Sequence, residues 1–434
     1  MKYEGYIYYK LVKTISIIKI HLLKIIIFMR KTMVRKMEGN NKKEKLSLGI
    51  ILILAMALPM LILYACGALA PFILREGIID RELLGGFTLA AFGVAAILSL
   101  FAGQWVKKWG VRWAGIILFL STGGAFTVLI LANHPWLMML AIAICGIAQA
   151  LSNPMTNQAI ASQVAPENKS FMVGLKQSGV QIAALAAGSV LPLIATQSGW
   201  KAALGSIIPL CLLMALLVYV HNWSSKITIY PTKPRTSIKH RNSAQLNMIS
   251  MLMLMQGCVG VVLSAFITQV PIFAVQLGMS LEQAAFLITL FGLIGWCSRL
   301  FLTPLANRFK QESDLLALLF IFAFLALIAT FNATHQNLWL IYVGVIGIGC
   351  TLVATNALAM AMLIQHECFG DIPIASGRVS SAFFGGLALG ALCFQWITTY
   401  FETIHSGMIF MLMLLSLSFI SVLRLRWGLS QQSD

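Results

Sequence analysis

Twelve apolar runs, each long enough to cross a lipid bilayer, determine what this chain can fold into. A transmembrane helix needs about 20 mostly apolar residues. With 59% hydrophobic and 10% charged residues, the chain is more apolar than a soluble globule, in which about a quarter of the residues are charged. The runs lie at 48–73, 83–106, 114–132, 136–162, 171–196, 200–220, 246–273, 283–305, 315–331, 338–364, 374–397 and 404–423. The sequence therefore predicts an all-α integral membrane protein.

One long polar interval divides these runs six and six. We expect an N-terminal six-helix bundle at residues 47–220, a linker at 221–245, a C-terminal six-helix bundle at 246–424 and a tail at 425–434. Residues 1–46 form a basic N-terminal segment. Two interpretations of that segment stay open: a helix lying at the membrane interface, or an over-extended start, with translation beginning at Met33 or Met37.

The two halves resemble each other at a shift of about 200 positions. Pro71 falls on Pro271, Glu82 on Glu282, and Lys176 on Arg378. Parallel repeats of six spans are typical of transporters, in which substrate binds near the bilayer midplane between the repeats. The alignment predicts two pseudo-symmetric bundles with a cation at the same depth in the fifth helix of each.

The basic residues indicate how the chain is oriented. From Lys42 onward, one set of loops and termini carries nearly all Lys and Arg, whereas the other set carries only Arg75, Arg81 and Lys201. Since positive loops stay in the cytoplasm, both termini and the linker are predicted to be cytoplasmic, in a multi-pass protein of a bacterial-type inner membrane. The net charge of +17 is explained by these loops, so no nucleic-acid partner is predicted.

Lys176 is the residue on which the functional prediction rests. It lies inside the apolar run 171–196, beside Gln177 and close to Gln181. An embedded charge costs roughly 2.5–3.5 kcal/mol on insertion scales, which indicates a role. We expect it to bind an anionic substrate; the alternative is a structural role, with the amine reaching the cytoplasmic surface or the carbonyls that end the fourth helix.

Amides form a stripe in the fourth helix, because Gln149, Asn153 and Asn157 recur at four-residue spacing. Such a stripe faces protein or water, so it either lines a cavity or joins helices by hydrogen bonds. Tyr64 is a candidate ligand in the first helix, with packing as its alternative. The predicted substrate-binding set is Lys176, Gln177, Gln181, Gln149, Asn153, Asn157, Tyr64, Gln256, Thr355 and Asn356.

The loop after the second helix carries a family resemblance. It reads Gly103-Gln-Trp-Val-Lys107-Lys108-Trp-Gly110-Val-Arg112, and a degenerate second copy surrounds Asn307-Arg308. With the six-plus-six layout, the chain resembles the major facilitator superfamily, whose loop is similar but carries an acidic residue where Lys107 and Asn307 stand. The resemblance implies that helices 1, 4, 7 and 10 line a cavity, with 2, 5, 8 and 11 beside it. It also implies a gate, for which the candidate residues are Gly103, Lys107, Lys108, Gly110, Arg112, Arg299, Asn307, Arg308 and Arg378.

Two departures from the family pattern narrow the expected function. Because neither loop copy contains the acid, the loop's usual charge pair with the opposite half is not predicted. The antiporter signature of the fifth helix is also absent, which disfavours drug–proton antiport. A faint resemblance to the cyanate and organic-anion branches favours an anionic substrate.

No Asp or Glu lies inside any of the twelve runs. Since proton relays in carriers use embedded carboxylates, a coupled proton would have to use the substrate or an acid at a helix end. We predict a monomeric secondary active transporter that moves a small anionic solute by alternating access, with symport favoured over exchange. The alternatives are a neutral or zwitterionic solute, an efflux or exchange protein, and a transport-dead sensor or scaffold. No enzyme activity, cofactor or metal is predicted, since no CxxC, HExxH or similar spacing occurs.

Overall fold

The computed structural model describes residues 42–77, 81–223, 241–309 and 311–433. Predictions for residues 1–41 and for most of the linker lie outside these ranges. Within them the chain is helical and contains no strand, so the predicted all-α fold is confirmed. The helices are α2 (Lys42–Ala68), α3 (Ala70–Arg75), α4 (Arg81–Leu131), α5 (Pro135–Gln163), α6 (Lys169–Ser189), α7 (Leu191–Ser198), α8 (Trp200–Gly205), α9 (Ile208–Val220), α10 (Arg241–Gln276), α11 (Leu281–Leu305), α12 (Glu312–Phe331), α13 (Trp339–Gln365), α14 (Ile372–Tyr400) and α15 (Ile404–Ser433).

In the described ranges, 11 helical stretches are long and apolar enough to cross a membrane. One of them lies in α4, whose 51 residues would form a straight rod of roughly 75 Å, more than twice the hydrocarbon thickness of a bilayer. Gly110 interrupts that helix with φ 78 and ψ 166, a backbone conformation that glycine adopts without steric cost. The helix therefore supplies two antiparallel spans, which brings the number to the predicted twelve.

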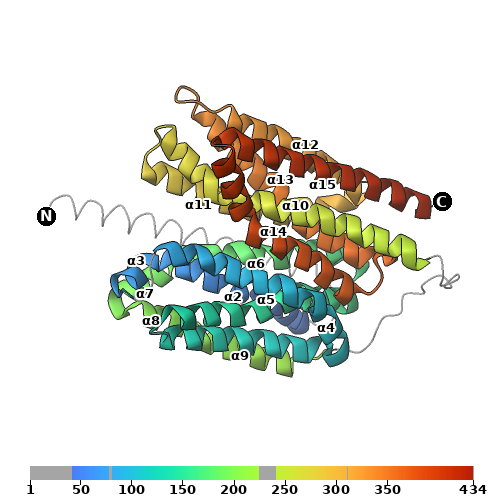
Figure 1. Ribbon diagram of the computed structural model, residues 1–434. Coiled ribbons are helices and arrows are strands. Elements are labelled where there is room, and N and C mark those ends of the chain that lie inside the picture. The colour runs from blue at the N-terminus through green and yellow to red at the C-terminus, as the bar shows by residue number, and fades with distance from the viewer. Residues whose placement is uncertain (1–41, 78–80, 224–240, 310, 434) are drawn as a thin grey trace.

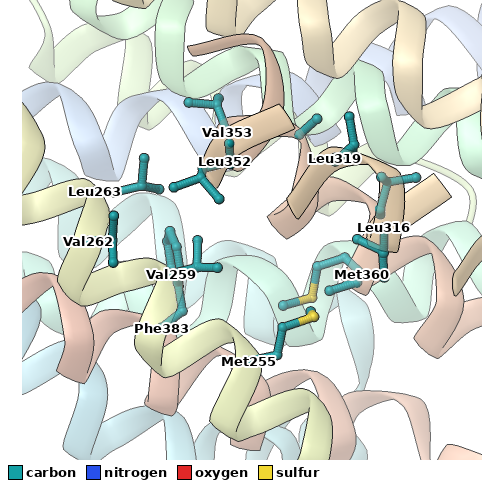
Figure 2. Packing of buried hydrophobic residues seen from close by; sticks show 14 of the residues in the cluster. Met255, Val259, Val262, Leu263, Leu316, Leu319, Leu352, Val353, Met360 and Phe383 are labelled. Atoms are coloured by element: carbon teal, nitrogen blue, oxygen red, sulfur yellow. The ribbon is translucent and has the colours of Figure 1, made fainter. Parts of the chain in front are cut away.

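Figure 1 shows the helices in two groups, α2–α9 and α10–α15. One buried apolar cluster contains only residues from the first group, between Ile51 and Val218. The second cluster is centred on the other group and extends across to residues of the first half such as Phe171 and Met172. Figure 2 shows part of it, where side chains from α10, α12, α13 and α14 meet around Val259 and Leu352.

The halves meet at several helix crossings, and two of them, α6 on α11 and α14 on α4, occupy matching places in the two halves. A Cβ on Gly174 would lie 2.4 Å from the Arg299 carbonyl oxygen, and a Cβ on Gly377 would lie 2.4 Å from the Ser99 carbonyl oxygen. Ser99 and Arg299 are 200 positions apart, and the two glycines are 203 apart. The crossings are thus copies of one contact, and both require glycine because the backbones touch.

This register changes one expectation from the sequence. A shift of 203 in the fifth helix of each half places Lys176 opposite Val379, not opposite Arg378. Lys176 is fully buried, whereas Arg378 is half-buried. The two cations therefore lie within about 1.5 Å of the same depth, but they are not equivalent, because they differ by one position in the register and in burial.

Candidate functional site

A cavity of about 240 Å³ lies between the halves. It is lined by side chains from α2, the first span of α4, α5, α6, α10, α11, α13 and α14. These are spans 1, 2, 4, 5, 7, 8, 10 and 11, as the family resemblance implies. None of the described residues that line the cavity belongs to α9, α12 or α15. These helices lie on the outer sides of the two groups in Figure 1.

Arg299 is the charged side chain of this cavity wall. It belongs to α11 and is 5% exposed. Its Nη1 donates to the Gln177 carbonyl oxygen at 2.8 Å and to Gln181 Oε1 at 2.6 Å, and its Nε donates to the Val353 carbonyl oxygen at 3.1 Å. A guanidinium has five N–H donors. In the described part of the chain, the two on Nη2 have no hydrogen-bond acceptor.

Lys176 lies behind the cavity wall and does not line it. Its side chain is 0% exposed, and Nζ donates to Asn153 Oδ1 at 3.2 Å, Thr156 Oγ1 at 2.7 Å and Asn157 Oδ1 at 2.5 Å. An ammonium has three N–H donors, so all three are used. Neither a carboxylate nor bulk water contacts the amine among the described residues, and a cage of neutral oxygens holds the charge.

The same amides connect the two halves. With their oxygens turned to Lys176, Asn153 donates through Nδ2 to Ser380 Oγ at 2.9 Å, and Asn157 donates through Nδ2 to Ser376 Oγ at 2.7 Å. The serines belong to α14 of the C-terminal half. Lys176 thus fixes which way each amide points, and the amides join α5 to α14. We call Lys176, Asn153, Asn157, Ser376 and Ser380 the amide bridge.

The remaining predicted substrate residues divide into two groups. Tyr64, Gln149, Asn153, Gln177, Gln181 and Asn356 line the cavity. Asn157, Gln256 and Thr355 are buried outside the lining. Gln256 Oε1 accepts from Asn356 Nδ2 at 3.1 Å, and Thr355 donates to the Leu352 carbonyl oxygen.

We call the end of the bundle at which α10 and α14 begin and α15 ends (right in Figure 1) the basic end; Lys107 and Lys108 of α4 and Arg424 of α15 belong to it. Here the halves are in contact. Lys107 Nζ lies 2.7 Å from Asp371 Oδ2 of α14's N-cap. A charge pair thus joins the halves at this loop although neither loop copy contains an acid, because the acid comes from α14 of the other half.

Other gate candidates lie at the same end. Ser170 donates to Asn307 Oδ1 at 2.7 Å, which joins the start of α6 to the end of α11. A Cβ on Gly103 would lie 2.4 Å from the Pro373 carbonyl oxygen, so α4 and α14 touch there too. The structure leaves the candidates Lys108, Gly110, Arg112 and Arg308 exposed and Arg378 half-buried.

Sequence reasoning placed Arg299 with the gate, whereas the structure places it in the cavity lining. The sequence did indicate that Arg299 is embedded, because it lies inside the apolar run 283–305. It stands six residues before Leu305, where α11 ends. Thr156, Ser376 and Ser380 were missed altogether. Small hydroxyl residues are common inside spanning helices, so their identity alone did not indicate a role.

In the described ranges, no group of three His, Cys, Asp or Glu side chains could hold a metal ion. The site is a largely apolar cavity between the two halves, with several polar side chains and the cation of Arg299 in its lining. Its arrangement suits binding of a small solute near the middle of the membrane.

Comparison with known proteins identifies the class of membrane protein. Residues 48–367 match the family model of the Major Facilitator Superfamily. The chain is a multi-pass transporter of this class: it belongs to the major facilitator superfamily.

Three solved structures illustrate the similarity in fold. The Escherichia coli fucose:proton symporter FucP superposes with a TM-score of 0.65 at 17% identity, over 87% of this chain and 99% of that one. The human organic anion transporter MFSD10 gives 0.66 at 12% identity, over 88% and 99%. The proton:xylose symporter XylE gives 0.65 at 14% identity, over 88% and 95%.

One curated relative is similar in sequence. "Probable anion transporter 4, chloroplastic" of Arabidopsis thaliana is 24% identical over 124 residues. The match covers 29% of this chain and 22% of that protein, so this chain spans about a fifth of the relative's length.

Proposed function

We propose that the protein is a secondary transporter that moves a small organic anion across the membrane by alternating access. The observation that carries this proposal is the unequal use of donors by the two embedded cations. Lys176 donates its three N–H groups to protein oxygens, whereas Arg299 lines the cavity and its two Nη2 N–H groups have no acceptor among the described residues. Arg299, and not Lys176, is the residue assigned to bind the anion.

The charge balance of the cavity supports an anion. Its lining contains Arg299 and no Asp or Glu. A buried cation without a counter-charge is costly, and an incoming carboxylate would both pair with it and accept from the Nη2 group. A charge-assisted hydrogen bond of this kind is stronger than a neutral one.

Alternating access is supported by the links between the halves. Arg299 of α11 donates hydrogen bonds to Gln177 and Gln181 of α6, so it joins the two halves beside the cavity. A carboxylate that bound end-on to the guanidinium would use Nη1 as well as Nη2, and would therefore displace Gln181 Oε1 from Nη1. In this proposal, substrate binding releases one of the contacts that must break before the basic end opens.

A co-transported proton has no carboxylate in the cavity lining to carry it. We favour symport over exchange. We infer that a co-transported proton crosses the membrane bound to the substrate itself. The proposal places the protein as a monomer in a bacterial inner membrane, with both termini in the cytoplasm. The names of one sequence relative, a probable anion transporter, and of the organic anion transporter MFSD10 agree with an anionic substrate for this chain.

The test is uptake into proteoliposomes. Purified full-length protein would be offered organic anions, inorganic anions, and neutral and cationic solutes. We expect uptake of organic anions, and we expect Arg299→Gln to reduce it at least tenfold, since a hydrogen bond to a charged group contributes about 1.5–3 kcal/mol and 1.4 kcal/mol is about tenfold. The matched control is Arg424→Gln, which removes an exposed arginine of α15.

Two results would contradict the proposal. Transport restricted to neutral or cationic solutes would show that the substrate is not an anion. Parent-level anion uptake by Arg299→Gln would show that the cavity cation does not bind it. Arg299→Lys distinguishes charge from geometry, because an ammonium keeps the charge and loses the planar fork.

A further inference from the structure

We propose that the cavity selects a monocarboxylate with a compact apolar body, of which an aromatic ring is the best fit. This inference rests on the proposed function and specifies its substrate class. Three properties of the cavity carry it: one unpaired charge, predominantly apolar walls with several aromatic rings, and a volume below that of drug-sized sites.

The single charge limits the substrate to one anionic group. Arg299 is the charged residue of the lining, and Lys176 is closed off by its oxygen cage. A second carboxylate would enter an apolar cavity without a counter-ion, at a cost that makes buried unpaired charges rare. The site therefore disfavours dicarboxylates and multivalent inorganic anions.

The walls are suited to an apolar body. Four phenylalanines and two methionines line the cavity together with leucine, isoleucine and valine. The Phe92 and Phe384 rings stack across the two halves with centroids 5.8 Å apart and an interplanar angle of 10°. A hydrated inorganic ion would have to give up its water shell to contact such walls, whereas an apolar body gains by leaving water.

The cation and the rings lie at different depths. Phe291 and Arg299 both belong to α11 and line the cavity. They are eight residues apart, which is about 12 Å along a helix. Arg299 is nearer the basic end, because α11 runs toward Asn307. A ligand that pairs its carboxylate with Arg299 and packs its apolar body against Phe291 has the carboxylate on the side of the basic end and the apolar body toward the opposite end.

The volume sets the size of the body. The cavity measures about 240 Å³, below the roughly 300–1,000 Å³ of sites for drug-sized ligands. It is nevertheless several times the roughly 30 Å³ that one water molecule occupies in the liquid. A small inorganic anion would leave most of it unfilled, whereas a benzoate-sized molecule suits it.

The experiment measures how a panel of unlabelled solutes stabilises purified full-length protein against heat, and then how the same solutes compete for anion uptake. The carboxylate series is acetate, butyrate, hexanoate and benzoate. Succinate adds a second charge, nitrate and phosphate lack the apolar body, and hexanamide and benzamide lack the charge. Ligands that bind only the folded protein raise its Tm.

We expect the Tm shift and the competition to increase from acetate to hexanoate and benzoate, with little effect of succinate, nitrate, phosphate or the amides. If succinate binds as well as benzoate, the monocarboxylate assignment is wrong and the organic-anion transporter stands. If nitrate or phosphate binds as well as benzoate, the monocarboxylate assignment is wrong and the transported anion need not be organic. If the amides bind as well as the acids, the proposed function itself fails. No response to any member of the carboxylate series also overturns the inference.

Phe291→Ala tests the apolar wall directly. We expect it to reduce the preference for benzoate over acetate at least tenfold, because one methylene in an apolar pocket already changes selectivity about 10–200-fold. Phe286→Ala is the matched control, since Phe286 lies on the same helix and is 54% exposed. If Phe291→Ala does not fold, Phe291→Leu keeps an apolar side chain and removes the ring. An unchanged benzoate preference in the folded variant would contradict the assignment.

Discussion

At the scale of single residues, the two embedded cations differ in how many donors they have left. Lys176 donates three times to neutral oxygens of α5, whereas Arg299 lines the cavity and its two Nη2 donors have no acceptor in the part of the chain that the structure describes. Burial alone does not distinguish them, because both side chains are nearly inaccessible. What distinguishes them is the geometry of their partners.

A substitution at Lys176 tests this distinction. We expect Lys176→Met to lower the free energy of unfolding by about 1–3 kcal/mol for each buried acceptor that is left unpaired, which a lower Tm of the purified protein would report. We also expect its half-saturation concentration for the anion to change less than that of Arg299→Gln. Lys108→Met, at an exposed lysine, is the control. A stable Lys176→Met protein that no longer binds the anion would instead assign the lysine to the substrate.

The sequence identified Lys176 and the amide stripe as unusual, because a charge and amides inside apolar runs are costly. It could not reveal that the lysine would donate to Asn153 and Asn157 of that stripe and to Thr156 between them. The distance from Nζ to the Asn157 oxygen depends on how α5 and α6 pack, which spacing along one helix does not specify. The role of Arg299 was missed for the same reason, since the cavity forms only when α11 meets α6.

At the scale of helices, the closed interface depends on glycines that let backbones touch. Gly174 and Gly377 make the same contact at the two pseudo-symmetric crossings. Small residues at such crossings are what allow spanning helices to approach closely. A methyl group at either position would push α6 from α11, or α14 from α4.

We expect Gly174→Ala and Gly377→Ala to favour conformations in which the basic end is open. Electron–electron distance measurements between spin labels at positions 108 and 308 would report the separation, after the reactive native cysteines are replaced. Gly124→Ala in α4 is the control, because no atom lies within 4 Å of the added methyl group and the change in helix propensity is the same. Unchanged distances in both interface variants would show that the crossings do not hold this end closed.

The twelve spans were predictable, since a run of about 20 apolar residues has few alternatives in a membrane. The joining of spans 2 and 3 through Gly110 was not, because only the backbone angle at Gly110 shows where α4 turns. The Lys107–Asp371 pair was also beyond the sequence, because its members are 264 positions apart and belong to different halves.

At the scale of the whole molecule, the number of spans fixes the relation between the termini. An even number of crossings returns the chain to the side from which it started, and we expect that side to be the cytoplasm because it carries nearly all the positive residues. The described helices agree with an even number, since α4 counts as two spans.

Reporter fusions test this topology. We expect green fluorescent protein fused after Asp434 to fluoresce, and alkaline phosphatase fused after Asn133 to be active, because the first reporter requires the cytoplasm and the second the opposite side. A phosphatase fusion after Lys108 is the control and should be inactive. An active phosphatase at Asp434 would mean that the orientation is inverted or that the number of spans is odd.

The oxygen cage of Lys176 also bears on how the protein is made. Asn153, Thr156 and Asn157 precede the lysine in the chain, so a ribosome delivers α5 to the membrane before α6 emerges. Chains generally fold from their N-terminal parts first during synthesis. The acceptors are therefore already at hand when the charged segment arrives, and the lysine can be inserted without waiting for the C-terminal half to be translated.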